Sequence, residues 1–172
     1  EYSALVASNK ISFEECLPVV QARASLMHDA CEQYPGTMAV VMGLSADDVE
    51  SLVAELELPH DLWVANLNCP GQVVLSGTKK GIEKGKEAAL KKGAKRVLSL
   101  PVHGAFHSGL MQEAAAALAP KILSAPFKAS DIELVMNVPG KRVEDLSQVK
   151  DYLIDQVTHP VRLQQCINSI ES

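Results

Sequence analysis

Apolar and polar positions repeat with different periods along the chain, and these periods divide it into three stretches. Residues 12–33 show helical spacing behind a capping box of Ser12 and Glu15, whereas residues 35–101 switch between short apolar runs and amphipathic segments. Residues beyond 101 return mainly to helical spacing. We expect helices over 1–8, 12–33, 45–57, 78–92, 110–123 and 147–157 and from 159 onward, and strands over 37–43, 62–68, 72–77, 95–100 and 132–137.

The first long helix is expected to bury a single apolar face. Leu17, Val20, Ala24 and Met27 share that face at helical spacing. Pro18 lies one turn into the helix, where we expect it to kink the helix or to reset its start.

The middle stretch has the order strand, helix, strand, strand, helix, strand, which is the ferredoxin-like βαββαβ order. We therefore predict an α/β protein in which residues 35–101 form a small inserted domain. Residues 1–34 and 102–172 are then parts of one larger α/β domain. These flanks hold too few strands for a sheet of their own, so we expect a fragment of a longer protein.

Composition and charge exclude several classes of protein. The 172 residues are 47% hydrophobic and carry a formal net charge of −5, which is typical of a globular protein and argues against nucleic acid as the main partner. No apolar run is long enough to span a bilayer and no secretory leader is recognised, so a cytoplasmic protein is expected. Without C-x-x-C spacing, the four cysteines favour reduced thiols over a disulfide framework or a metal site.

Two histidines and a serine lie in the connection between the strand at 95–100 and the helix at 110–123. His107 is the leading candidate for a general base, because imidazole titrates near neutrality and such loops hold catalytic histidines in α/β folds. His103 is a weaker candidate, and either histidine could be incidental. Ser108 adjoins His107, but adjacent side chains diverge, so we expect it to cap the following helix rather than to act as a nucleophile.

Arg23 and three amides are candidates for ligand binding. Arg23 lies in an apolar segment of the first long helix, where its charge needs a carboxylate or a route to water. A guanidinium fork suits a substrate carboxylate, and a structural ion pair or an ordinary surface arginine is the alternative. Asn66, Asn68 and Gln72 flank a turn at residues 70–71, where they could bind a polar ligand or simply form the turn.

Half of the 16 basic residues gather between residues 79 and 96 of this acidic chain. Such asymmetry can steer an acidic partner, and a solvated helix face is the alternative. The residues considered for partner contact are Lys79, Lys80, Lys84, Lys91 and Arg96.

Four segments together resemble the malonyl-CoA:acyl carrier protein transacylase family. Residues 1–5 (EYSAL) resemble the sequence after the family's G-H-S-L-G elbow, and residues 21–27 (QARASLM) resemble its R-x-x-x-M helix. Residues 66–77 (NLNCPGQVVLSG) resemble its N-x-P-G-Q-V-V-x-x-G hairpin, and residues 101–111 (PVHGAFHSGLM) resemble its P-V-x-x-x-F-H-S-x-L-M loop. Gln156, before an H-P-V run, agrees with a fifth and shorter segment.

The resemblance implies an α/β-hydrolase-like large domain with the ferredoxin-like unit inserted. It also implies an acyltransferase of fatty acid biosynthesis, which moves a malonyl group from malonyl-CoA to acyl carrier protein through a seryl ester. By this resemblance His107 would be the base, and the main-chain carbonyl of Gln156 would fix its tautomer.

The resemblance further implies how the substrate is held. Arg23 would bind the free malonyl carboxylate, and Met27 would lie beside it in the acyl pocket. Asn66 and Asn68 would line the approach of coenzyme A. Acyl carrier protein is the implied partner, malonyl-CoA is a substrate, and no bound cofactor or metal is expected.

The family's nucleophilic serine is not found in this chain, which contains no G-x-S-x-G. We therefore expect that an N-terminal segment with the serine and a C-terminal end are missing, that these residues alone are inactive, and that the complete protein is a monomer. The alternatives are a carrier-protein docking fragment without catalysis, a polyketide-type acyltransferase, and a serine hydrolase of the same fold. Arg23 and the basic residues count against the hydrolase.

Overall fold

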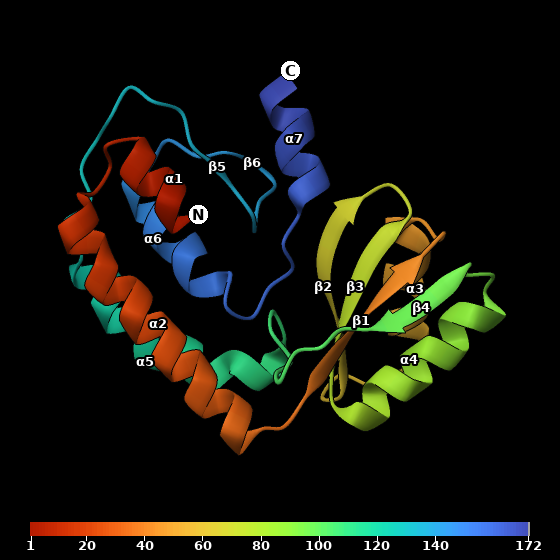
Figure 1. Cartoon of the computed structure of the whole chain (residues 1–172). Helices are drawn as coiled ribbons and strands as arrows, with labels where there is room; N and C mark the ends of the chain where they lie inside the picture. The colour runs from red at the N-terminus through yellow and green to blue at the C-terminus, as the bar shows by residue number, and fades with distance from the viewer. Residues whose placement is uncertain (172) are drawn as a thin grey trace.

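A computed structural model describes residues 1–171, so residue 172 at the end of the second predicted flank lies outside the described part. Figure 1 shows a sheet with two helices on one side of the molecule and a group of helices on the other. The helices are α1 (Tyr2–Ala7), α2 (Phe13–Gln33), α3 (Ala46–Glu55), α4 (Lys79–Lys91), α5 (Gln112–Ser124), α6 (Leu146–Asp155) and α7 (Leu163–Glu171), with a 3-10 turn at Gly109–Met111. The strands are β1 (Thr37–Met42), β2 (Leu62–Cys69), β3 (Gln72–Gly77), β4 (Arg96–Ser99), β5 (Val135–Met136) and β6 (Lys141–Arg142).

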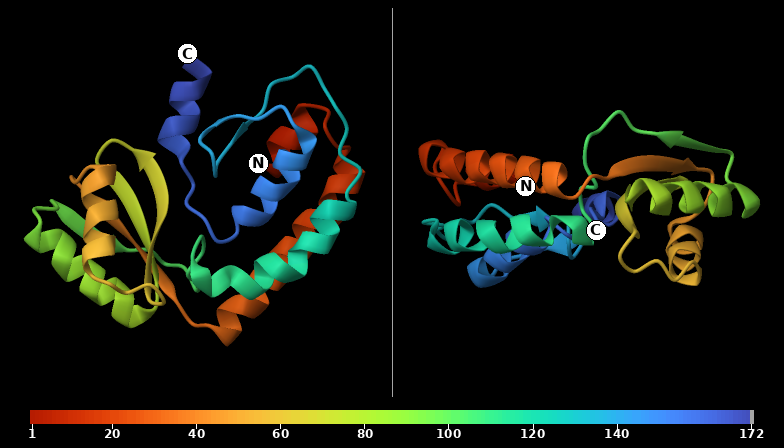
Figure 2. Two further views of the ribbon diagram at one scale, coloured as in Figure 1. Left: turned by 180° about the vertical axis from the view of Figure 1, so that it is seen from behind. Right: turned by 90° about the horizontal axis from the view of Figure 1, so that it is seen from below.

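The larger sheet has the strand order β2-β3-β1-β4, and every neighbouring pair is antiparallel. Its chain order, β1-α3-β2-β3-α4-β4, confirms the predicted βαββαβ order. Helices α3 and α4 cover one face, where Val41, Leu75 and Ile82 belong to a buried apolar core (Figure 2). On the opposite face, Met38, Ala65 and Val74 pack against Phe106 of the loop that carries His107.

The capping box at the start of α2 is confirmed. The Ser12 hydroxyl accepts from the amide of Glu15, and the Glu15 carboxylate accepts from the amide of Ser12. The helix begins at Phe13 and continues through Pro18, so the predicted reset of its start is wrong. The capping box fixes the start one turn earlier because it satisfies the free amides there.

The predicted buried face of α2 is confirmed only at Met27. Leu17, Val20 and Ala24 are exposed, whereas Cys16 and Val19 are buried. The buried stripe is therefore rotated toward the side that packs on α5, and Arg23 falls within it at helical spacing from Cys16 and Met27. Leu17 and Val20 border a groove between α1 and α2.

Three boundaries in the C-terminal part differ from the predictions. The strand expected over 132–137 is reduced to β5, whose only sheet partner among the described residues is β6. Helix α6 begins at Leu146, one residue before the predicted start, because Asp145 caps it by accepting from the amide of Ser147. Helix α7 begins at Leu163 rather than at 159, because the chain before it is extended and pairs with β2.

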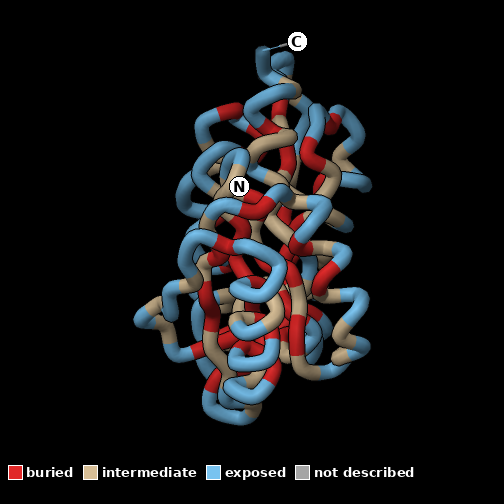
Figure 3. Tube along the Cα trace, turned by 90° about the vertical axis from the view of Figure 1, so that its right-hand side faces the viewer, coloured by how far each residue is buried: buried red, intermediate tan, exposed pale blue. Residues whose placement is uncertain are grey.

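This extended segment joins the two sides of the molecule. Val161 forms a parallel bridge with Asn66; its amide donates to Ala65 and its carbonyl accepts from Leu67, each at 2.8 Å. Phe106 adds an apolar connection, since it packs against both the core of α2, α5 and α6 and the cluster around Met38. Figure 3 shows buried stretches along the length of the trace, between exposed ones.

Candidate functional site

His107 lies in the loop between β4 and the 3-10 turn, with its backbone in the left-handed region at a φ of +57°. Ser108 stabilises this turn, since its fully buried hydroxyl donates to the carbonyl of Ala105 and accepts from the amide of Leu110. Ser108 is also the N-cap of the 3-10 turn, as its position in the sequence predicts. The exposed His103 does not line the cavity described below.

The imidazole of His107 is oriented by a main-chain atom. Its Nδ1 lies 2.7 Å from the carbonyl oxygen of Gln156, which can only accept, so Nδ1 carries the proton and Nε2 is left as the basic atom. Burial lowers the pKa of His107 and the Arg23 charge lowers it further, against the carbonyls of Gln156 and His159, which raise it. The ring is therefore neutral at pH 7, the form that a general base requires.

Arg23 approaches the same residue from α2. Its Nη2 donates to the side-chain Oε1 of Gln156 at 3.0 Å, and its Nε is buried without a hydrogen-bond partner among the described residues. Arg23 forms no ion pair within residues 1–171, which removes the structural ion pair that the sequence left open. Burial raises the pKa of the nearby Glu1 and raises that of Tyr2 to about 12.

A cavity of about 450 Å³ lies between α2, the His107 loop and the face of the sheet opposite α3 and α4. Both His107 and Arg23 line it, so the structure brings the predicted base and the predicted carboxylate-binding residue together. The other lining residues are Met27, Met38, Asn66, Asn68, Val74, Leu100 and Phe106. The Asn68 amide donates to Gln72 at 3.1 Å, so the three amides considered from the sequence do lie on this side of the sheet.

The apolar walls were only partly foreseen. Met38, Val74 and Leu100 were not identified as site residues, and their signal is weak because they read as ordinary strand residues. Phe106 lies within the recognised loop motif, which could have indicated it. The contact between Arg23 and the side chain of Gln156 was missed, since these residues are 133 positions apart in the chain.

The basic residues between 79 and 96 do not form one face. Arg96 lies directly opposite Met42 in the β1–β4 ladder, so its side chain is on the sheet face that carries the cavity. The exposed lysines of α4 lie on the covered side of the sheet, away from the cavity. Met42 follows the cavity residue Met38 by four positions, which places Arg96 about 14 Å along the strand from the cavity wall.

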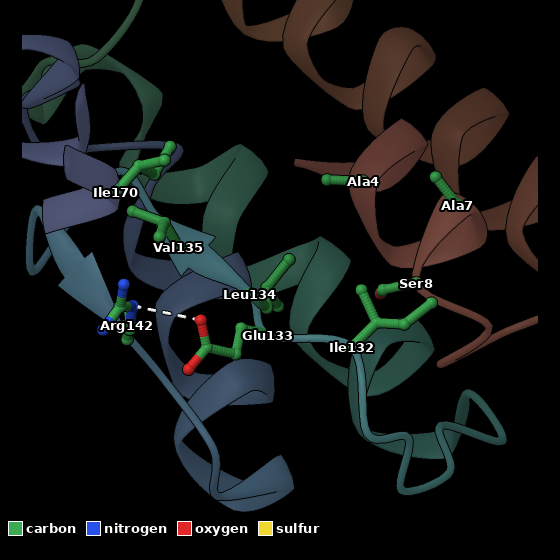
Figure 4. Close-up of a pocket in the computed structure, with 9 residues that line it drawn as sticks. All are labelled: Ala4, Ala7, Ser8, Ile132, Glu133, Leu134, Val135, Arg142 and Ile170. Atoms are coloured by element: carbon green, nitrogen blue, oxygen red, sulfur yellow. Dashed lines mark ion pairs between the residues drawn. The ribbon is translucent and has the colours of Figure 1, made fainter.

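A further cavity of about 480 Å³ contains none of the predicted site residues (Figure 4). Helix α1, the segment around β5 and the end of α7 surround it, and an ion pair between Glu133 and Arg142 at 3.2 Å lies on its rim. Its remaining lining residues are Ala4, Ala7, Ser8, Ile132, Leu134, Val135 and Ile170.

Whether the His107 cavity can supply a nucleophile depends on the side chains in its walls. No serine, threonine or cysteine is among its described lining residues. Cys16, Cys31 and Cys166 are buried, and burial raises the pKa of each thiol; Cys69 is exposed. The site can therefore accept a proton and bind an anion, but its described residues supply no nucleophile.

Two features of residues 1–171 bear on other functions. No group of three or more histidine, cysteine or acidic side chains is placed to hold a metal ion. No helix in this part of the chain combines the length and the apolar character needed to cross a bilayer.

A base and a cation at one cavity are compatible with group transfer, and a model of the acyl transferase domain matches residues 1–172, so the chain belongs to this family. Within it, the chain is 37% identical over 171 residues to the malonyl CoA-acyl carrier protein transacylase of Bacillus subtilis. That match covers 99% of this chain and 54% of the relative, so the chain spans about half the length of the relative. The resemblance to this class of transacylase is thereby confirmed.

Solved structures give the same result. The acyl-carrier-protein S-malonyltransferase of Burkholderia pseudomallei superimposes with a TM-score of 0.91 at 40% identity, over 99% of this chain and 56% of that protein. A malonyl-transacylase in complex with its type II PKS acyl-carrier protein superimposes with a TM-score of 0.92 at 32% identity, over 99% of this chain and 55% of that protein. The mixed α/β fold of this chain is therefore that of malonyltransferases.

Proposed function

We propose that this chain supplies the general base and the carboxylate-binding residue of an enzyme that transfers malonyl from malonyl-CoA to acyl carrier protein in fatty acid biosynthesis. The observation that carries the proposal is that His107 and Arg23 line one cavity and both donate hydrogen bonds to Gln156. The names of the relatives support the choice of malonyl as the acyl group and of a carrier protein as the acceptor.

In the first half-reaction, Nε2 of His107 takes the proton of a serine hydroxyl supplied by the part of the family fold outside this chain. The serine oxygen attacks the thioester carbonyl of malonyl-CoA, and the tetrahedral intermediate collapses by breaking the C–S bond. The imidazolium then gives its proton to the leaving thiolate of coenzyme A. The Gln156 carbonyl holds Nδ1–H throughout, so that Nε2 stays directed at the reacting atoms.

In the second half-reaction, the phosphopantetheine thiol of the carrier gives its proton to His107 and attacks the seryl ester. The C–O bond breaks, the serine oxygen recovers the proton, and malonyl leaves on the carrier. Arg23 binds the free carboxylate of the malonyl group in both halves, beside Met27. Asn66 and Asn68 line the side of the cavity through which coenzyme A and the carrier arm would approach.

The domain organisation belongs to the same proposal. Residues 1–34 and 102–172 are parts of an α/β-hydrolase-like large domain, and residues 35–101 are its ferredoxin-like insertion. The antiparallel sheet with α3 and α4 on one face supports the insertion, and its opposite face forms one wall of the cavity. Arg96, on this opposite face, is better placed for an acidic carrier protein than the lysines of α4. No bound cofactor and a cytoplasmic location remain predictions.

The test is formation of the malonyl ester. The chain is combined with the serine-bearing N-terminal segment of its family, fused or as a second polypeptide, and incubated with malonyl-CoA. Intact mass should show one malonyl ester, which then transfers to acyl carrier protein. His107→Gln should abolish the ester, whereas His103→Gln on the same loop should not. Absence of the ester from the completed wild-type enzyme, with carrier binding retained, would instead support the docking-only alternative.

A further inference from the structure

Gln156 is a buried amide that serves two partners with two different carbonyl groups. Only 4% of the residue is exposed, and it lies at the C-terminal end of α6. Its main-chain oxygen accepts from Nδ1 of His107 at 2.7 Å, and its side-chain Oε1 accepts from Nη2 of Arg23 at 3.0 Å. A side-chain substitution at this position can therefore remove one contact and leave the main-chain atom of the other in place.

We propose that Gln156 is a positioning residue, whose side chain holds the Arg23 guanidinium at a fixed place relative to His107. The carboxylate bound by Arg23 is then held at a constant distance from the base. This inference rests on the proposed function and adds a role for a side chain that the resemblance does not assign. The main-chain carbonyl of Gln156 orients the base, and its amide orients the cation.

The arginine needs such a support because its own helix does not provide one. Arg23 has a long, flexible side chain, and within residues 1–171 it forms no ion pair. The hydrogen bond to Gln156 uses Nη2, and Nε is buried without a partner among residues 1–171. A guanidinium fixed at one donor pays less entropy when a carboxylate binds its other donors.

A neutral amide suits this role better than a carboxylate would. A carboxylate at the same place would pair with Arg23 and compete with the malonyl group for the guanidinium. An amide oxygen holds the cation without cancelling its charge. That charge lies close enough to lower the pKa of His107, so a bound substrate carboxylate should reverse part of this effect.

The experiment uses the 172-residue chain and a small probe, so that it does not depend on catalysis. Monomethyl malonate carries one free carboxylate, and dimethyl malonate carries none. Each is titrated into ¹⁵N-labelled protein while the imidazole resonances of His107 are followed by NMR across pH. The variants are Gln156→Met, which keeps the volume, and Gln156→Glu, which keeps the shape; Gln148→Met, at an exposed position on the same helix, is the control.

In the wild-type chain, monomethyl malonate should bind and raise the pKa of His107, and dimethyl malonate should do neither. Gln156→Met should weaken monomethyl malonate binding about tenfold, because the unsupported arginine side chain must then be ordered when the ligand binds. Gln156→Glu should weaken it further. In both variants Nδ1 of His107 should stay protonated, because the main-chain carbonyl is unchanged. Gln148→Met should behave as the wild type.

The experiment can refute the proposed function and the role of Gln156 separately. If the wild-type chain does not prefer monomethyl to dimethyl malonate, Arg23 is not a carboxylate site, and the proposed function fails together with this inference. If the wild type shows the preference but both Gln156 variants bind within twofold of it, the proposed function stands and the positioning role of Gln156 is refuted.

Discussion

Replacing Arg23 by alanine should change which acyl group the completed enzyme accepts. The guanidinium can give two charge-assisted hydrogen bonds to a malonyl carboxylate, each worth about 1.5–2 kcal/mol in a half-buried site. Their loss amounts to roughly 3–4 kcal/mol, or a 10²–10³-fold fall in kcat/KM for malonyl-CoA. Acetyl-CoA has no carboxylate to lose, so its kcat/KM should change by less than about tenfold.

The assay measures kcat/KM for malonyl-CoA and acetyl-CoA with acyl carrier protein as the acceptor. Arg142→Ala is the matched control, because Arg142 is an exposed arginine on the rim of the other cavity. Thermal unfolding of each variant is measured alongside, since alanine at position 23 also leaves the Gln156 amide oxygen without its partner. Equal losses for the two acyl groups in a folded Arg23→Ala enzyme would refute the assignment of Arg23 to the malonyl carboxylate.

Three further predictions concern the base and the fold. Because the pKa of His107 is lowered in the folded chain, acyl transfer should fall as pH drops through that lowered value. The neutral His107 also contributes folding stability that is present above pH 6.5 and should be lost as pH falls through the same lowered pKa. Ser108→Ala should lower the free energy of unfolding by about 1–3 kcal/mol in urea, because it leaves the Ala105 carbonyl without its partner. Gly81→Ala should cost more than about 2 kcal/mol, since its Cβ would overlap the backbone oxygen of Asp61.

Each of these has a simple check. The pH dependence of stability should flatten in His107→Gln, and an unchanged slope would assign it to another group. The exposed Ser124 hydroxyl also donates to a carbonyl three residues earlier in the chain, so Ser124→Ala is the control. Equal losses of unfolding free energy in Ser124→Ala and Ser108→Ala would contradict a stabilising role for the buried Ser108 hydroxyl. Glu87→Ala on the exposed side of α4 controls for helix propensity, and a Gly81→Ala protein as stable as this control would contradict the overlap.

Local signals predicted the elements well where the chemistry is local. The capping box of Ser12 and Glu15 depends only on neighbours within a few positions. The buried face of α2 could not be chosen in this way, because two adjacent stripes are both apolar and only packing on α5 selects one. The strand over 132–137 was overpredicted, since β-branched residues favour extension whether or not a neighbouring strand is present.

The candidate site followed the same division. Motif resemblance indicated His107, Arg23 and the main-chain role of Gln156, and in the structure the first two line one cavity and both bond to Gln156. The hydrogen bond between the two side chains of Arg23 and Gln156 depends on the long-range packing of α2 against the end of α6, which no short pattern encodes. The grouping of Arg96 with the lysines failed because strand pairing, not proximity in the chain, decides the side of the sheet.

The short pairing of Val161 with β2 restricts how the cavity can open. One of its walls belongs to the sheet and the other to the helices, and the hydrogen bonds of Val161 to Ala65 and Leu67 fasten the two walls within a few residues of both Asn66 and Gln156. These bonds hold the two walls together at the β2 edge of the sheet, beside the asparagines proposed to line the approach of coenzyme A. The base and its orienting carbonyl therefore keep a constant spacing on the side where the substrate arm would enter.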